Sequence, residues 1–435
     1  MNIRIFAILA CIAVLFAQCN KQSAIITPPG NQEEFTLTVK NEFNELQAHY
    51  AVYLSDEDGK VVAFRWLPGD DTARIVVQGA ANNARYDCTL AKIVVIDASG
   101  SGLRDTAISL TTYTRIASGE TINLRDLNYK QNTDLRVQFT GITSLDSIIV
   151  SDGLTFSRPQ QANSFIGQYR VEHTGKIWLR IRINGEDKWR FMLFENVNSE
   201  NLEATIDATL LPTIFSHPKD IALPFVAAWQ YKIDGVVDLA ALRFFPLGDL
   251  LRAPGGAIPV FNNINVFEPV INDVFNPEPK PYGDFRVQVK GAGSPPDAYT
   301  YFSDRIYPEL PAQLPVPSFD LLASPLSNNR YTAANTSGSV DLLSFTRSRA
   351  GTPSLSWEVL AAPVTSGFVT YRLPDLPKEL ADLSLSLKLY DFGNAVQVRG
   401  EAYDQYQGYE QVISQHLQND DPLWQAKAGY TGKAR

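Results

Sequence analysis

The sequence predicts an all-β protein in which two to three β-sandwich domains follow one another along the chain. Nearly every ordered stretch alternates apolar and polar residues with a period of two, which indicates strands rather than helices. The stretches are short, and turn residues interrupt them about every 8–12 residues, a spacing typical of sandwiches. The chain has 435 residues, enough for two to four domains of roughly 100–200 residues each.

The first domain is predicted over residues 33–130. Residues 35–39 alternate cleanly, and residues 50–54 and 61–64 flank a short turn rich in Asp and Gly, a pattern that indicates a hairpin. Further strands are predicted at residues 74–77, 92–96, 108–114 and 122–124.

Two stretches of this region, LSDEDGKVV (residues 54–62) and YDCTLAKIVV (residues 86–95), carry a resemblance to a known class of module. They resemble the N-terminal β-sandwich modules of uncharacterised bacterial surface lipoproteins, which are similar to the carboxypeptidase-regulatory-like and immunoglobulin-like folds. The resemblance covers residues 33–128 and implies an immunoglobulin-like (Ig-like) sandwich. It implies no functional residue.

A second β-sandwich is predicted over residues 131–212. Its clearest element is a hairpin in which Asn184-Gly185 joins alternating runs at 177–183 and 186–194, because both turn residues tolerate positive φ. The alternation directs one set of side chains to the core: Ile177, Leu179, Ile181 and Ile183. The opposite set is predicted to face outward or to line a neighbour: Trp178, Arg180 and Arg182.

Residues 213–417 are predicted to form a Pro-rich β domain, or two such domains. Within it, residues 383–390 alternate leucine with polar residues and predict a half-buried strand, and Pro377 is placed to begin a short helical turn. The polar tail, residues 418–435, is predicted to be flexible, with residues 429–435 disordered.

The N-terminus predicts export and lipid attachment. Arg4 precedes an apolar run over residues 5–17, which suits the core of a signal peptide and is shorter than the about 20 residues of a membrane-spanning helix. The sequence Leu15-Phe16-Ala17-Gln18-Cys19 resembles the lipobox of bacterial lipoproteins, although Gln18 stands where a small residue is usual. The resemblance implies a signal peptide at 1–18, fatty acylation of Cys19 and a tether at 19–32. Two alternatives stay open: ordinary secretory cleavage with Cys19 unmodified, and cleavage before Cys11.

Charge and cysteine content narrow the function classes. The formal net charge is −9 and no run of basic residues exceeds two, which argues against a nucleic-acid partner. Apart from Cys11 and Cys19, the chain has one cysteine, Cys88, whose position in an alternating run predicts a buried core thiol.

No catalytic or cofactor motif stands out. The sequence has no GxSxG elbow, P-loop, GxGxxG or CxxC, and its four histidines have no metal-ligand spacing. The run Asp56-Glu57-Asp58-Gly59 lacks the full ligand set of a calcium loop and predicts a hairpin turn. We therefore expect no cofactor, no metal and no enzyme activity; a hydrolase with two facing carboxylates is the catalytic alternative.

Aromatic residues, 11% of the chain, are the one compositional sign of binding. Tyr403, Tyr406 and Tyr409 are spaced by threes and predict a surface platform for a ligand; the same spacing also fits a helix that packs its apolar stripe on a sheet. The leading hypothesis is a protein anchored by lipid in the outer membrane, with a structural or binding role and an envelope protein as partner. The alternative is a surface glycan-binding protein of a polysaccharide uptake system.

Overall fold

The structure is a computed structural model that confirms the predicted all-β, multi-domain fold. Residues 1–32, with the predicted signal peptide, tether and Cys19, lie outside the described residues. The structure describes residues 33–42, 48–69, 71–97, 104–124, 132–151, 156–157, 163–170, 175–186, 189–197, 201–214, 216–217, 221–222, 228–238, 243–246, 270–271, 274–275, 283–292, 299–315, 317, 319–324, 331–337, 339–350, 354–363, 368–392, 396–418 and 428–434.

The largest element is a sheet of twelve described strands drawn from both halves of the chain. All neighbouring strands in it are antiparallel except β6 and β27, which pair in parallel. The strand order is β19 (Arg243–Pro246), β18 (Ala228–Asp238), β22 (Asp284–Ala292), β23 (Thr300–Tyr307), β30 (Tyr430–Ala434), β29 (Val396–Tyr403), β26 (Leu342–Arg349), β27 (Ser354–Ala361), β6 (Arg104–Ile116), β5 (Tyr86–Asp97), β2 (Ala48–Ser55) and β3 (Val61–Leu67).

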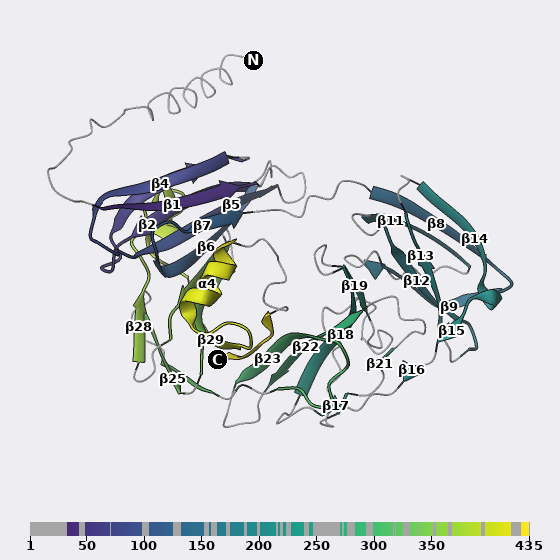
Figure 1. Cartoon of the computed structure of the whole chain (residues 1–435). Coiled ribbons are helices and arrows are strands. Elements are labelled where there is room, and N and C mark those ends of the chain that lie inside the picture. The colour runs from purple at the N-terminus through teal and green to yellow at the C-terminus, as the bar shows by residue number, and fades with distance from the viewer. Residues whose placement is uncertain are drawn as a thin grey trace, which may run out of the picture.

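Two buried clusters pack against this sheet. One joins it to a small sheet of β4 (Asp71–Ala80), β1 (Glu33–Asn41) and β7 (Thr121–Leu124) and to α4 (Tyr409–Gln418), which lies near β6 in Figure 1. The other cluster includes Trp357 and Tyr53 together with residues of a second small sheet and two short helices. These elements are β24 (Asp320–Ser324), β25 (Tyr331–Ser337), β28 (Phe368–Arg372), α2 (Lys378–Ala381) and α3 (Leu385–Lys388).

Both clusters contain residues from the N-terminal and the C-terminal parts of the chain. The first includes Phe35 from β1 and Val412 from α4. Residues 33–124, most of the predicted first domain, therefore share their cores with residues 319–428. The Ig-like assignment of this region stays a prediction.

The region after residue 131 has its own cluster between two sheets. The sheets are ordered β10-β9-β12-β13-β15 and β11-β8-β14, and their inner side chains, among them Phe139 and Ile181, form one cluster. The strands are β8 (Asn132–Thr140), β9 (Leu145–Ser151), β10 (Phe156–Ser157), β11 (Ser164–Arg170), β12 (Ile177–Ile183), β13 (Trp189–Phe194), β14 (Asn201–Asp207) and β15 (Thr213–Ile214). The 3-10 helix η1 (Ala208–Leu210) follows β14, and two short pairs complete the region: β16 (Ser216–His217) with β21 (Val274–Phe275), and β17 (Ile221–Ala222) with β20 (Val270–Ile271).

Both predicted hairpins are confirmed. β2 pairs with β3 around the Asp/Gly turn, and β12 pairs with β13 around Asn184-Gly185, where Gly185 has φ +86°. The side chains predicted for the core of β12 are buried or packed against the cluster. Trp178 and Arg180, on the other face, are also buried, and the Arg180 guanidinium lies 4.1 Å from the centre of the Trp189 ring. On the outer face of β12, Trp178 and Arg180 are therefore buried, whereas Arg182 is partly exposed.

The predicted strand at 383–390 is wrong, because this segment contains the short helix α3 instead. The Ser384 hydroxyl accepts a hydrogen bond from the Leu387 amide (3.0 Å), which caps the helix in the manner typical of serine. Leu387 is buried, whereas Leu389 is 60% exposed. Just upstream, α2 begins after Pro377 at its N-cap position, as predicted.

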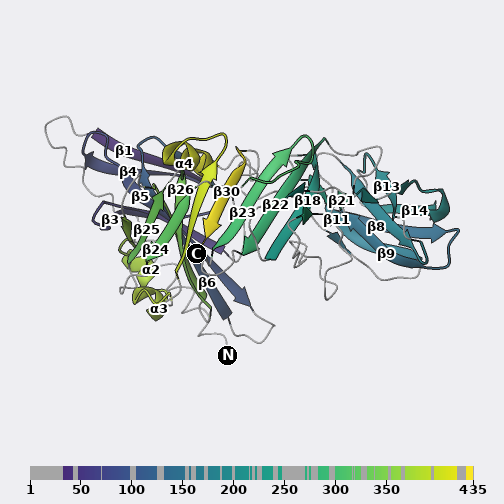
Figure 2. The same ribbon diagram turned by 90° about the horizontal axis from the view of Figure 1, so that it is seen from below.

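The predicted disorder at 429–435 is also wrong. Residues 430–434 form β30, which is paired on both sides, with β23 and with β29, in the interior of the large sheet (Figure 2). Gly432 lies opposite Phe302 on one neighbour and Glu401 on the other. The absence of a side chain at Gly432 leaves room for the Phe302 ring, which lies over it and carries the Arg399 guanidinium 3.8 Å from its centre.

Replacing Gly432 by alanine should destabilise the fold. A Cβ atom there would lie 2.1 Å from Phe302 Cζ and 2.7 Å from the Gly400 carbonyl oxygen, so the ring would have to shift against Arg399. We expect Gly432→Ala to lower the free energy of unfolding by about 1–3 kcal/mol, the usual cost of overpacking, as measured by chemical denaturation. Gly283→Ala is the matched control, because a Cβ there meets nothing within 4 Å, and its effect should stay within about 0.5 kcal/mol. Equal losses in the two variants would contradict this packing.

Candidate functional site

The three tyrosines expected to form a surface platform lie at the junction of β29 and α4. Tyr403 and Tyr409 are only 7% and 8% exposed and belong to the core cluster, and Tyr406 is half-buried against it. The prediction of an exposed platform is therefore wrong for Tyr403 and Tyr409. The alternative holds for Tyr409, since α4 buries it together with Val412, Ile413 and Leu417.

The hydroxyl of Tyr409 fastens α4 to the large sheet. It donates toward the carbonyl oxygens of Thr114 (2.6 Å) and Leu360 (2.9 Å) and accepts from Thr114 Oγ1 (3.0 Å). Burial raises the pKa of this phenol, so it stays a neutral donor. The role of Tyr409 is thus to hold β6, β27 and α4 together.

Tyr403 lies beside two charged side chains of its own strand, β29. Its hydroxyl donates to Glu401 Oε2 (2.5 Å), and Glu401 also lies 2.5 Å from Arg399 Nε. Burial raises the pKa of Glu358, with a further contribution from Glu401, while Arg399 acts in the opposite direction. Arg399 is therefore held between the Glu401 carboxylate and the Phe302 ring.

A second polar group lies on the neighbouring strands β22 and β23. The Asp304 carboxylate accepts from Arg286 Nε (2.9 Å) and Nη2 (2.6 Å), a bidentate pair, and from Gln288 Nε2 (2.8 Å). Asp304 is almost fully buried. Its charge is matched by Arg286, so it adds little net negative charge at this place.

Between these two groups the sheet has a hollow of about 240 Å³. Its lining comes from four strands: Gln288, Val289, Lys290, Thr300, Phe302, Ser303, Asp304, Gln397, Arg399 and Ala434. Ala434 of β30 lies opposite Thr300 and Arg399, and directly paired residues point to the same face of a sheet. The small residue on β30 between longer side chains on β23 and β29 accounts for the hollow.

The hollow itself was not predicted from the sequence. Within the Pro-rich region the sequence predicts strands at residues 284–290 and 299–302, which the structure confirms as β22 and β23. No strand is predicted at β29, and β30 lies in the predicted flexible tail. One sequence feature is consistent with the hollow. Gly432 and Ala434 are two small residues spaced by two in β30, so both lie on one face of the strand.

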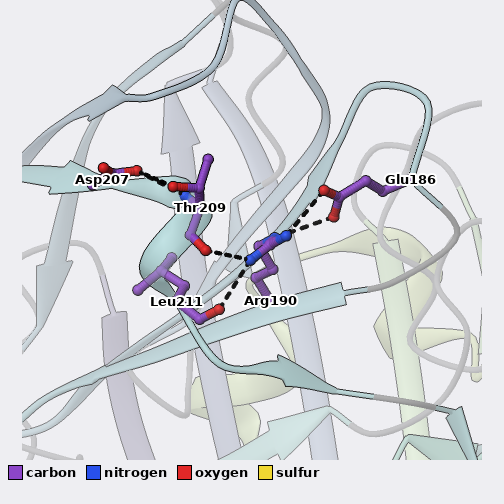
Figure 3. Close-up of polar contacts among 5 residues, drawn as sticks. All are labelled: Glu186, Arg190, Asp207, Thr209 and Leu211. Atoms are coloured by element: carbon purple, nitrogen blue, oxygen red, sulfur yellow. Dashed lines mark hydrogen bonds and ion pairs between the residues drawn. The ribbon is translucent and has the colours of Figure 1, made fainter.

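Elsewhere, a cluster of polar contacts in the second region supports the fold (Figure 3). Arg190 donates to both carboxylate oxygens of Glu186 and to the carbonyl oxygens of Thr209 and Leu211, at 2.9–3.1 Å. Asp207 caps η1 by accepting from the Thr209 hydroxyl and amide, and these bonds lower its pKa. These bonds tie the β12–β13 hairpin to the segment around η1.

The Asp56–Gly59 run considered for calcium binding lies in the turn of the β2–β3 hairpin. In the described part of the chain, no group of three or more His, Cys, Asp and Glu side chains could hold a metal ion. The Asp56–Gly59 segment is a turn in which Asp56 Oδ1 accepts from the Lys60 amide (2.8 Å). Cys88 is buried as predicted, and burial raises the pKa of its thiol.

The tryptophans make no exposed array among the described residues. Trp178, Trp189 and Trp357 are buried, and Trp66 on β3 is 41% exposed. The side chain of Trp229 and the whole of Trp424 lie outside the described residues. No described helix is long and apolar enough to cross a membrane.

Comparison with known proteins does not identify a family for this chain. No family model matches the chain, and no curated protein matches it. Two solved structures are similar over long stretches. The tip fimbrial protein Mfa3 from Porphyromonas gingivalis, with C-terminal truncation, has 11% identity and TM-score 0.18 and covers 63% of this chain and 99% of its own. The Bacillus anthracis TIE protein has 8% identity and TM-score 0.14, and covers 80% and 74%. Both TM-scores are below 0.5, so neither similarity supports a conclusion about the fold or the function of this chain.

The half-buried His416 of α4, whose Nδ1 atom is buried, predicts a pH-dependent stability. Its ring packs edge-on against Tyr113, with centroids 5.4 Å apart, and burial lowers its pKa to about 4 from 6.5. Between pH 6.5 and 4 the unfolded state takes up more protons than the folded one, so this stability is complete above pH 6.5 and is lost as the pH falls. At about 1.4 kcal/mol per pKa unit, the loss by pH 4 is about 3 kcal/mol.

Urea denaturation of the wild type and of His416→Phe at pH 7, 6, 5 and 4 tests this. The variant keeps an aromatic ring in the site but has no titrating group, so its stability should fall by about 3 kcal/mol less over this range. Parallel pH dependences for the two proteins would show that His416 titrates alike in the folded and unfolded states.

Proposed function

We propose that the chain is a lipid-anchored protein of the bacterial envelope, attached to the outer membrane through Cys19, with a structural or binding role rather than a catalytic one. The observation that carries the proposal is the lipobox-like sequence Leu15-Phe16-Ala17-Gln18-Cys19 after an apolar run. The first strand begins at Glu33, fourteen residues after Cys19. A segment of this length reaches at most about 50 Å when fully extended, which sets how far from the membrane the folded part would lie.

The fold supports a structural or binding role. The twelve-stranded sheet continues without a break from β19 to β3, and it joins segments far apart in the sequence into one hydrogen-bonded unit. Two buried polar side chains of this unit, Tyr409 and Asp304, form hydrogen bonds that join different elements. Such a unit suits a protein that presents a surface while fixed at one end.

Replacing Cys19 by alanine should abolish lipid attachment. Cells that express the full chain and are fed an alkyne analogue of palmitate should label the wild-type protein in the membrane fraction. The Cys19→Ala protein should be unlabelled and leave that fraction, because a membrane-bound lipid chain contributes about 0.8 kcal/mol for each buried CH₂ group.

Cys11→Ala and Cys88→Ala are the matched controls, and both should keep the label. Cys11 is the other cysteine that could follow a cleavage site, and Cys88 is buried in the core. Label that persists in Cys19→Ala, or that disappears in Cys11→Ala, would overturn the assignment of the lipid to Cys19.

A further inference from the structure

Two cationic side chains line the hollow between β22, β23, β30 and β29. Lys290 and Arg399 line it, while the carboxylate of Asp304 is already paired with Arg286. Glu401 is the carboxylate next to Arg399. Because Arg399 is paired with Glu401 and Asp304 with Arg286, Lys290 supplies the positive charge that favours a ligand with a negative charge.

Arg399 is held in place before any ligand arrives. Its guanidinium lies over the Phe302 ring at 3.8 Å from the centroid, its Nε faces Glu401, and its side chain is one-third exposed. A guanidinium that is fixed by stacking loses less conformational freedom on binding a carboxylate than a free side chain does. The fixed Arg399 therefore favours a carboxylate as the charged group of the ligand.

The remaining lining suits hydroxyl groups. Gln288, Gln397 and Thr300 can donate and accept hydrogen bonds, as the hydroxyls of a sugar require. A volume of about 240 Å³ is below the roughly 300–1,000 Å³ of sites for drug-sized ligands, and it fits one small unit. With only two lining cations, the hollow lacks the basic cluster that binds polyphosphates.

We propose that this hollow binds one uronic acid unit of an acidic polysaccharide, with its carboxylate at Arg399 and Lys290 and its hydroxyls at Gln288, Gln397 and Thr300. This inference rests on the binding role proposed above and identifies a ligand for it. Binding of the sugar does not require a lipid on Cys19. Failure of acylation and failure of sugar binding are therefore separate results.

Affinity electrophoresis of the full chain, purified in a non-ionic detergent, tests the proposal. Gels containing polygalacturonate should retard the protein, and gels containing its methyl ester, the same backbone without the charge, should not. Lys290→Gln should weaken the retardation constant about tenfold, as expected for the loss of one charge-assisted contact. Lys290 is exposed at the rim, so this change should leave the fold intact.

Lys40→Gln is the matched control, since Lys40 is an exposed lysine on β1 outside the hollow and the charge change is the same. It should bind as the wild type does. Arg399→Gln, with its folding checked by thermal unfolding, should bind more weakly than the wild type.

The proposal is overturned if polygalacturonate does not retard the wild type, or if the methyl ester retards it equally. It is also overturned if Lys40→Gln and Lys290→Gln lose equal affinity, because binding would then follow net charge alone.

Discussion

The parallel pairing of β6 with β27 is the interaction on which the rest of the large sheet depends. It places residues 107–113 beside residues 354–360, and the Trp357 indole donates to the Thr112 hydroxyl (2.8 Å), which is itself within 2.8 Å of Thr89 Oγ1. Both partners of this bond are buried, so a polar group left unpaired there would cost stability. Through this pairing the strands before residue 124 acquire the C-terminal strands as neighbours, and both buried clusters draw residues from the two sides.

The same continuity positions the proposed binding site. β29 continues the sheet beyond β26, and β30 joins it to β23 and β22, so Arg399 and Lys290 come to flank one hollow although they are far apart in the sequence. The contact of Phe302 with Gly432 packs β23 against β30. The same Phe302 ring holds the Arg399 guanidinium in place. In this account a structural requirement of the sheet, a small residue in β30, also creates the space for a ligand.

Features that depend on interactions between residues close in the sequence were predicted, and features that depend on long-range contacts were not. The two hairpins and the all-β class were predictable, because alternation and turn residues act over a few residues. The leucines of 383–390 alternate like a strand, but Ser384 caps a helical turn and no strand pairing forms there. The polar segment around β30 has little strand signal of its own, and its order comes from partners on both sides. Tyr403 and Tyr409 have the spacing of a surface platform; their burial depends on long-range packing that spacing alone does not encode.

Hydrogen–deuterium exchange across the large sheet tests the central claim most directly. Strand amides bonded within a sheet exchange only when the sheet opens, whereas amides of a frayed segment exchange at once. We predict that peptides covering residues 430–434 exchange as slowly as those covering β29, with strong protection also in β6 and β27. Rapid exchange of residues 430–434 beside a protected β29 would contradict a continuous sheet, and with it the hollow at its junction.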